Sequence, residues 1–168
     1  VKGNVTYVVD GEKYWEETVA YGTALTAPNA PVKEGYTFGG WRDVPQTMPA
    51  EDIEITSSFV VNGYKVIYKV DGEEYQSELV EYGSMINLPK YPIKEGHTFS
   101  GWQNVPESMP AEDITIEGTF TVNNYTVTFD VDGGSAISAM TVPYGTTAAA
   151  LSQVSTAKEG YTFAGWTL

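Results

Sequence analysis

Residues 33–41 read Lys33-Glu34-Gly35-Tyr36-Thr37-Phe38-Gly39-Gly40-Trp41. The stretch returns as residues 94–102 and again as residues 158–166, each time beginning with Lys-Glu-Gly and ending with Gly-Trp. A motif that recurs at a nearly constant spacing is typical of tandem repeats, in which each repeat folds as one structural unit. The sequence therefore predicts three consecutive repeats of one small unit.

The agreement between repeats extends outward from this motif on both sides. Asp10-Gly11 and Tyr21-Gly22 precede it and residues 48–53 (Met-Pro-Ala-Glu-Asp-Ile) follow it, and all three elements recur 61 residues later. This period is longer than the roughly 20–50 residues of solenoid repeats, so each repeat is predicted to be a small domain. The third repeat has no counterpart of residues 105–120, and we expect it to be truncated at its C-terminal side. The predicted domains are residues 1–62, 63–123 and 124–168.

The residue pattern inside a repeat is that of β-strands. Val5, Tyr7 and Val9 alternate with other residues, which is typical of a strand with one buried face, and the following Asp-Gly pair favours a hairpin turn. Proline-containing residues 20–31 cannot lie in a central strand and are expected to cross the sheet. A mostly β, mostly antiparallel domain with one crossover is predicted, with strands at residues 4–10, 14–19, 36–41 and 53–59. In the third repeat, alanine-rich residues 147–154 predict one helical turn.

Composition excludes several classes of function. With 22 acidic against 9 basic residues the net charge is −13, which argues against binding nucleic acid through a basic face. The chain has no cysteine and a single histidine, so disulfides, thiolate chemistry and histidine-based metal sites are not expected. His97 takes the position that Tyr36 and Tyr161 hold in the other repeats, which indicates a ring rather than a catalytic base. We therefore expect no enzyme, no cofactor and no metal.

The tryptophans are the candidate ligand-binding residues. Trp41, Trp102 and Trp166 recur at one position and could display rings for sugar stacking, but a domain of this size also needs large side chains for its core. Trp15 is replaced by Gln76 in the second repeat, so it is the better candidate for the surface. The adjacent carboxylates Glu51-Asp52 and Glu112-Asp113 could suggest a glycosidase, but neighbouring residues on a strand point apart, and solvated corners are favoured.

The motif of residues 33–41, with the preceding Asp-Gly, Tyr-Gly and Pro-x-x-Pro elements, resembles the internalin B-repeat, also called the Listeria-Bacteroides repeat. The resemblance covers essentially the whole chain. It implies a β-grasp-like fold and tandem repeats that act as stalks or adhesion modules in bacterial surface and secreted proteins. A full β-grasp lays a helix across its sheet, so the alternative is an α+β fold with a short helix in each repeat, at residues 20–31 in the first.

Two functions from different classes follow. The first is a non-enzymatic spacer, stalk and adhesion segment of an extracellular or cell-surface bacterial protein, with monomeric repeats in a longer chain. The second is a module that binds a host or cell-wall glycan, or a protein, through exposed aromatic residues and sheet edges. No stretch approaches the roughly 18 apolar residues of a membrane-spanning helix, so no membrane insertion is expected within this segment.

Overall fold

The computed structural model describes residues 1–167, which form two compact units. The first unit contains residues 1–68, 75–87 and 105–116, and the second contains the remaining described residues. The division passes through the second repeat. Three of its strands, β6 (Gly63–Val70), β7 (Glu73–Glu81) and β9 (Ile114–Gly118), contribute residues to both units.

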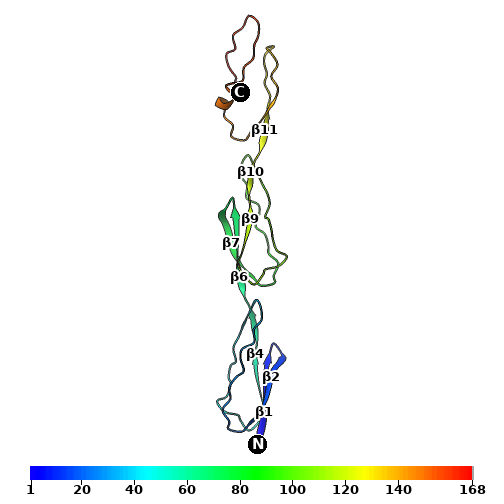
Figure 1. Cartoon of the computed structure of the whole chain (residues 1–168), viewed down its shortest axis with the longest axis vertical. Coiled ribbons are helices and arrows are strands. Elements are labelled where there is room, and N and C mark those ends of the chain that lie inside the picture. The colour runs from blue at the N-terminus through cyan, green and yellow to red at the C-terminus, as the bar shows by residue number, and fades with distance from the viewer. Residues whose placement is uncertain (168) are drawn as a thin grey trace. The chain divides into compact units, whose positions relative to one another are not determined.

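The first repeat is built on a three-stranded sheet in the order β2-β1-β4, in the blue to cyan part of Figure 1. Strand β1 (Lys2–Val9) pairs antiparallel with β2 (Glu12–Ala20) through the predicted Asp-Gly turn, where Asp10 and Gly11 both have positive φ. Strand β1 also pairs with β4 (Ile53–Ser57), and this pair is parallel. Parallel neighbours need a long crossover, which the proline-containing segment supplies.

A second, smaller sheet corrects the prediction for the later strands. Strand β3 (Tyr36–Phe38) pairs antiparallel with β5 (Phe59–Val61), so the strand predicted at residues 53–59 belongs to two sheets, through β4 and then β5. The strand predicted at residues 36–41 ends at Phe38, because Gly40 adopts a φ of 85° that no strand can continue through. The first repeat therefore has five strands rather than four.

The second repeat reproduces this arrangement. Its larger sheet has the order β7-β6-β9, and strand β8 (His97–Phe99) pairs antiparallel with β10 (Phe120–Val122). The hairpin turn at Asp71 and Gly72 again has positive φ at both residues. The prediction of a mostly β chain is confirmed.

The crossing segment is extended in the first two repeats. Among the described residues, neither residues 20–31 nor their counterparts 81–92 contain a helix. These segments are held instead by contacts such as the isolated β-bridge between Ala24 and Thr47. Prolines within these segments remove the backbone donors a helix would need. The alternative with a short helix in each repeat is thus wrong for the first two repeats, and the β-grasp helix is not confirmed there.

The third repeat has fewer strands. Strand β11 (Asn124–Val127) pairs with β12 (Met140–Pro143), and the predicted helical turn is confirmed as the 3₁₀ helix η1 (Ala148–Leu151). Strand β11 has four residues, whereas β1 and β6 have eight each. In the first repeat the C-terminal half of β1, Val5–Val9, pairs with β4, and in the second repeat β6 pairs with β9. Within residues 124–167, β11 pairs with β12 alone.

The core of each of the first two repeats lies under its larger sheet. Val5 and Tyr7 on β1 are fully buried, because alternate residues of the strand point to the same face. Met48, from the Met-Pro-Ala-Glu-Asp-Ile stretch, and Ile55 on β4 pack against them. The buried counterparts in the second repeat are Val66, Tyr68, Met109 and Ile116.

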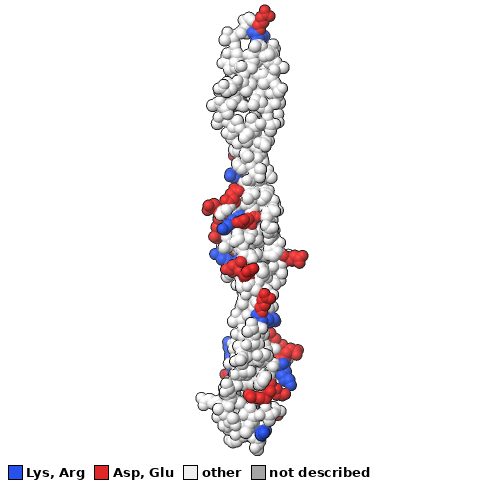
Figure 2. All heavy atoms as spheres, in the orientation of Figure 1, with Lys and Arg blue, Asp and Glu red and all other residues white. Residues whose placement is uncertain are grey.

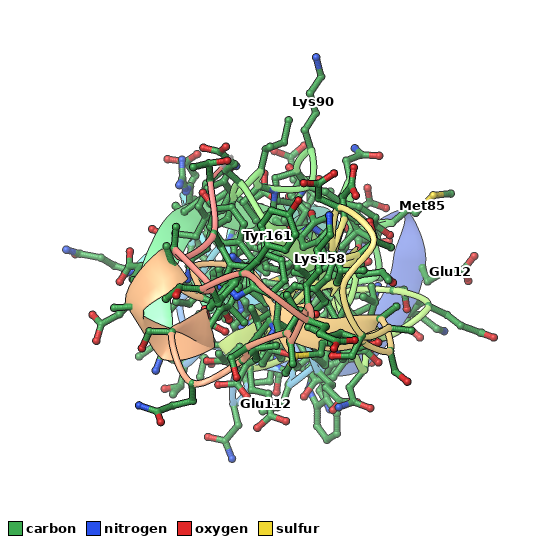
Figure 3. All side chains as sticks on the ribbon, turned by 90° about the horizontal axis from the view of Figure 1, so that it is seen from above. Glu12, Met85, Lys90, Glu112, Lys158 and Tyr161 are labelled. Atoms are coloured by element: carbon green, nitrogen blue, oxygen red, sulfur yellow. The ribbon has the colours of Figure 1, made fainter. Side chains whose placement is uncertain are left out.

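The outer surface carries the acidic charge. In Figure 2 carboxylates outnumber basic groups along the first two repeats, while the third repeat, at the top, is almost entirely white. Its charged residues are only Asp130, Asp132, Lys158 and Glu159. Figure 3 shows Glu12, Lys90 and Glu112 pointing away from the ribbon. The acidic residues that give the net charge of −13 thus lie on the solvated surface, and most of them belong to the first two repeats.

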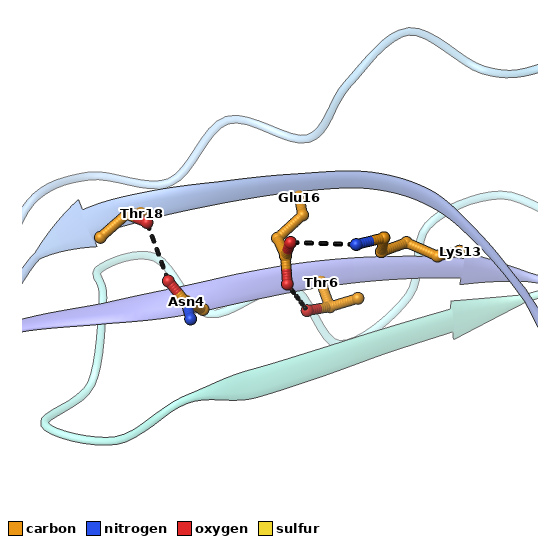
Figure 4. Close-up of polar contacts among 5 residues, drawn as sticks. All are labelled: Asn4, Thr6, Lys13, Glu16 and Thr18. Carbon is orange, nitrogen blue, oxygen red and sulfur yellow. Dashed lines mark hydrogen bonds and ion pairs between the residues drawn. The ribbon is translucent and has the colours of Figure 1, made fainter.

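Polar pairs cover the outer face of the β1–β2 hairpin (Figure 4). The Thr18 hydroxyl donates to Asn4 Oδ1 at 2.8 Å, and the Thr6 hydroxyl donates to Glu16 Oε1 at 3.2 Å. Lys13 Nζ lies 3.1 Å from the other oxygen of Glu16. The hydrogen bond and charge of Lys13 lower the pKa of the Glu16 carboxyl. This face is suited to water, so the hairpin buries only its inner side.

The two buried tyrosines differ in one hydrogen bond, which predicts opposite responses to phenylalanine. The Tyr68 hydroxyl donates to Glu78 Oε1 at 2.7 Å, whereas the Tyr7 hydroxyl has no partner among the described residues. A hydrogen bond to a charged group contributes about 1.5–3 kcal/mol, and an unpaired buried hydroxyl is a cost. Tyr68→Phe should therefore lower the free energy of unfolding by about that much, and Tyr7→Phe should leave it unchanged or raise it. Urea unfolding of both variants measures this.

The pH dependence provides a check on the same pair. Burial, and then the hydrogen bond to Glu78, raise the pKa of Tyr68 above the ordinary tyrosine value. The folded state then keeps the proton where the unfolded chain loses it, so this stability is complete below pH of about 10 and falls as the pH rises further. In Tyr68→Phe the free energy of unfolding should therefore fall less steeply at alkaline pH. Equal stabilities of the two variants at pH 7 would contradict the assignment.

Candidate functional site: the junctions between repeats

A single asparagine lies at the junction between the first and second repeats. Asn62 stands between β5 and β6. Its backbone N–H donates to the Gly35 carbonyl at 2.8 Å, and its carbonyl accepts from the Tyr82 N–H at 2.9 Å. Gly35 belongs to the Lys-Glu-Gly turn of the first repeat and Tyr82 to the Tyr-Gly pair of the second. The backbone of Asn62 therefore bonds to both repeats.

The side chain of Asn62 adds to these bonds. Its Oδ1 accepts from the Thr37 hydroxyl at 2.6 Å, and its Nδ2 donates to the Tyr64 hydroxyl at 3.4 Å. Thr37 lies on β3 and Tyr64 on β6, so the side chain also contacts both sides. An asparagine can accept at its oxygen and donate at its nitrogen simultaneously, which an aliphatic residue cannot.

Aromatic rings close the junction around Asn62. The Tyr82 ring lies edge-on to the Tyr36 ring at 5.9 Å between centroids, and Lys33 Nζ lies 4.1 Å from the Tyr36 centroid. Gly35 faces the Tyr82 ring so closely that an added Cβ would lie 2.1 Å from the ring. A glycine is needed here for its φ of 76° and also for this close approach.

The second junction repeats the backbone bonds, the threonine bond and the close approach of glycine to tyrosine. The Asn123 N–H donates to the Gly96 carbonyl at 2.8 Å and its carbonyl accepts from the Tyr144 N–H at 2.8 Å. Asn123 Oδ1 accepts from the Thr98 hydroxyl at 2.6 Å. An added Cβ on Gly96 would lie 2.0 Å from the Tyr144 ring. The junction is therefore a recurring structure of this chain.

His97 occupies the Tyr36 position in the second junction. Its ring lies edge-on to Phe120 and to Tyr144, with centroids 6.2 Å and 6.1 Å away. Its Nδ1 lies 2.8 Å from the carbonyl of Glu95. The side chain thus packs as a ring among rings, as the sequence comparison between repeats predicted.

The recurring tryptophans lie against the crossing segments. The indole N–H of Trp41 donates to the Pro28 carbonyl at 3.0 Å, that of Trp102 donates to Pro89 at 3.0 Å, and that of Trp166 donates to Val154 at 2.7 Å. Trp41 also lies edge-on to Tyr7 at 5.0 Å and to Phe38 at 4.9 Å. Trp102 is 7% exposed, and the other two are partly buried.

Trp15 is placed differently. It lies on β2, an edge strand of the sheet, and is 52% exposed. The structure does not bring it together with Trp41: the ring beside Trp41 is that of Tyr14, at 5.8 Å. Trp15 and Trp41, the two candidate tryptophans of the first repeat, therefore form no common surface.

The paired carboxylates bond to a strand distant in sequence. Asp52 Oδ1 accepts from the Asn4 N–H at 2.7 Å, and Asp113 Oδ1 accepts from the Lys65 N–H at 2.7 Å. Both aspartates are exposed, in keeping with the solvated corners that the sequence favours, and each also satisfies a backbone N–H of the first strand of its repeat. Among residues 1–167, no three histidine, aspartate or glutamate side chains gather in a way that could hold a metal ion.

Comparison with known proteins decides the family. The model of the Listeria-Bacteroides repeat domain matches residues 4–61, 64–122 and 125–168. The chain belongs to this family. The first match of the Listeria-Bacteroides repeat model ends directly before Asn62, and the second ends directly before Asn123.

Longer proteins contain similar Listeria-Bacteroides repeats. A protein of Evansella cellulosilytica named as a membrane protein is 31% identical over 93% of this chain and 26% of its own length. Internalin H of Listeria monocytogenes is 35% identical over 69% of this chain and 24% of its own. The chain thus spans about a quarter of the curated relatives it matches. No helix within residues 1–167 combines the length and apolar character that membrane crossing requires.

Solved structures of tandem repeats can be compared as well. The SHIRT (Streptococcal High Identity Repeats in Tandem) domains 3-4 from a cell surface protein align with 72% of this chain and 98% of their own, at 16% identity and a TM-score of 0.34. A TM-score of this size does not establish a common fold.

Proposed function

We propose that these Listeria-Bacteroides repeats form a non-enzymatic spacer and adhesion segment in a cell-surface or secreted bacterial protein. The observation that carries this proposal is the junction: Asn62 and Asn123 make the same backbone bonds to the repeats on either side, and the Oδ1 of each accepts from a threonine of the preceding repeat. A spacer must limit the angles between its units, and a junction in which one residue bonds to both neighbours does so. Membership of a repeat family and the membrane-protein name of a relative support the cell-surface location.

Pulsed electron paramagnetic resonance tests the junction directly. The chain has no cysteine, so spin labels can be placed at Glu12→Cys and Gln76→Cys, two exposed positions in the same compact unit. We expect one narrow distance distribution. The double substitution Asn62→Gly and Tyr82→Ala removes the side-chain bonds and the ring contact, and should broaden it.

A matched control is available in the first repeat. Tyr21 is the counterpart of Tyr82, and its side chain is 65% exposed. Tyr21→Ala removes the same ring without touching the junction, so the distance distribution should stay narrow. A broad distribution in the unsubstituted chain would overturn the spacer proposal, as would a junction variant with an unchanged distribution.

The second candidate function is binding of a host or cell-wall glycan, or a protein. The specific observation in its favour is Trp15, which is half exposed on the edge strand β2. The other three tryptophans support it less, because their indole N–H groups already bond to backbone carbonyls. Binding of this kind would therefore depend on Trp15 and on the sheet edges.

A further inference from the structure

The first junction contains a chemically labile pair of residues. Asn62 is the only asparagine of the chain that is followed by glycine, whereas Asn123 at the second junction is followed by Asn124. A glycine after asparagine has no Cβ to shield its backbone nitrogen, and it lets the backbone rotate more freely than any other residue does. Its nitrogen can therefore reach the side-chain amide of the preceding asparagine. The two junctions thus share their main contacts but differ in chemistry.

The reaction open to this pair is the loss of ammonia from Asn62, a covalent change that alters charge and hydrogen bonding. The Gly63 backbone nitrogen attacks Asn62 Cγ, the bond from Cγ to Nδ2 breaks, and Nδ2 leaves as ammonia with the proton that the Gly63 nitrogen gives up. Water then opens the resulting cyclic imide at either of its two carbonyl carbons. The net reaction consumes one water and releases one ammonia, with no oxidation or reduction, and the product is aspartate or isoaspartate.

Gly63 is open to the solvent that this reaction needs. It is exposed, and no atom lies within 4 Å of an added Cβ among the described residues. Its φ is not positive, so the backbone conformation at this position does not itself require glycine. No packing or backbone strain explains the glycine here, which distinguishes it from Gly35 in the same junction.

The closed junction opposes the reaction, because it holds the Asn62 amide at both ends. The Thr37 hydroxyl donates to Oδ1 at 2.6 Å, and Nδ2 donates to the Tyr64 hydroxyl at 3.4 Å. The backbone of Asn62 is fixed as well, by its bonds to Gly35 and Tyr82. Closing the imide ring requires the amide and the backbone to rotate toward each other, which these bonds restrict. The reaction rate should therefore follow the fraction of time for which the junction is open.

Isoaspartate at this position cannot rebuild the junction. Its main chain runs through Cβ and Cγ, which adds one methylene between the N–H of residue 62 and the carbonyl that follows it. In the intact junction these two groups bond to Gly35 at 2.8 Å and to Tyr82 at 2.9 Å, so the longer chain no longer matches both partners. Aspartate, by contrast, keeps the backbone and an acceptor for the Thr37 hydroxyl. Loss of the junction by this route is therefore irreversible and specific to isoaspartate.

We propose that Asn62 is a self-modification site: deamidation through Gly63, limited by opening of the junction, converts it to isoaspartate and permanently loosens the first junction. The second junction lacks the glycine and keeps its asparagine. The chain thus loses angular restraint at one defined place as it ages. The modification depends on the junction contacts alone, whereas its effect on the angle between repeats rests on the proposed spacer function.

Peptide mass spectrometry tests the site on the full 168-residue chain after prolonged incubation in mildly alkaline buffer. We expect aspartate and isoaspartate at Asn62 well before any conversion of Asn123. Tyr82→Ala, which removes the ring that closes the junction, should speed the conversion about fivefold, the scale of one aromatic contact. Tyr21→Ala removes the matching ring outside the junction and should leave the rate unchanged. Equal rates at Asn62 and Asn123 would overturn the site, and an unchanged rate in Tyr82→Ala would overturn its control by the junction.

Substitutions next to the two asparagines isolate the role of the glycine. Gly63→Ala touches none of the junction contacts described above and should slow the conversion of Asn62 to the rate seen at Asn123. Asn124→Gly places the labile pair in the second junction and should make Asn123 convert as fast as Asn62 does in the unsubstituted chain. Unchanged rates in these two variants would overturn the proposed reaction.

Spin-label distances measure the consequence separately from the chemistry. With labels at Glu12→Cys and Gln76→Cys, the distribution should be narrow in the fresh chain and in Asn62→Asp, and broad once residue 62 has become isoaspartate. Gly63→Ala incubated for the same time should stay narrow. A narrow distribution in the converted chain would overturn the loosening and leave the spacer proposal intact. A broad distribution in the fresh chain would instead overturn the spacer proposal, and mass spectrometry would still decide the modification.

Discussion

Gly35→Ala is expected to destabilise the first repeat by about 3 kcal/mol, because two costs coincide at this residue. The new Cβ would lie 2.1 Å from the Tyr82 ring, and the backbone φ of 76° disfavours any side chain. Displacing Tyr82 also breaks its edge contact with Tyr36. The substitution should therefore weaken the first repeat and separate it from the second.

Gly160→Ala is the matched control for this effect. Gly160 occupies the same place in the third Lys-Glu-Gly motif and has a φ of 79°, but no atom lies within 4 Å of its added Cβ among the described residues. Its cost should be only that of the backbone, about 1 kcal/mol. Amide exchange at Thr37 and at Thr162 reports the two repeats separately. Equal losses of stability in the two variants would mean that the Tyr82 ring moves aside freely and that the junction is not rigid.

Trp102→Ala should have an equally large effect on the second repeat. The side chain is 7% exposed, lies edge-on to Phe99 at 5.1 Å, and its indole N–H donates to the Pro89 carbonyl. Removing a buried tryptophan costs about 3–5 kcal/mol, and the crossing segment would lose a hydrogen bond to the repeat core. The urea midpoint of the second repeat, followed by amide exchange, should fall accordingly.

Trp15→Ala is the control for Trp102→Ala and also tests the binding alternative. Because Trp15 is 52% exposed on an edge strand, its loss should change stability by less than about 1 kcal/mol. It should also remove most of the iodide-quenchable fluorescence. A soluble glycan that perturbs the emission of the intact chain, and not of this variant, would favour the binding function. A small effect of Trp102→Ala on stability would instead favour a ligand-binding role for the recurring tryptophans.

Local patterns in the sequence predict the hairpins of this protein well. Val5, Tyr7 and Val9 alternate up to an Asp-Gly pair, and both the strand and the positive φ at Asp10 follow from nearby residues. The burial of Tyr7 and the exposure of Trp15 also followed, the second from comparing it with Gln76. Because the repeats share one pattern, equivalent positions within the chain can be compared with one another.

Pairing between distant segments was harder to predict. The parallel register of Val5 with Ile53 joins residues 48 positions apart, and an isolated strand pattern does not specify its partner. The bond from Asp52 to Asn4 was missed for the same reason. At the junction the available signal was the recurrence of Asn62 as Asn123 next to each repeat boundary, which looks like an ordinary short linker until the contacts are known.

The two junctions also bear on how such a chain can change in length. Tyr82 follows Asn62 by 20 residues and Tyr144 follows Asn123 by 21, yet both pairs form the same hydrogen bond. The contact surface tolerates this extra residue because the hairpin loop lies outside it. An in-frame duplication of a 61-residue unit would therefore join old and new copies through an interface that already exists. Genetic gain or loss of whole units would therefore change the number of repeats without any new contact having to evolve.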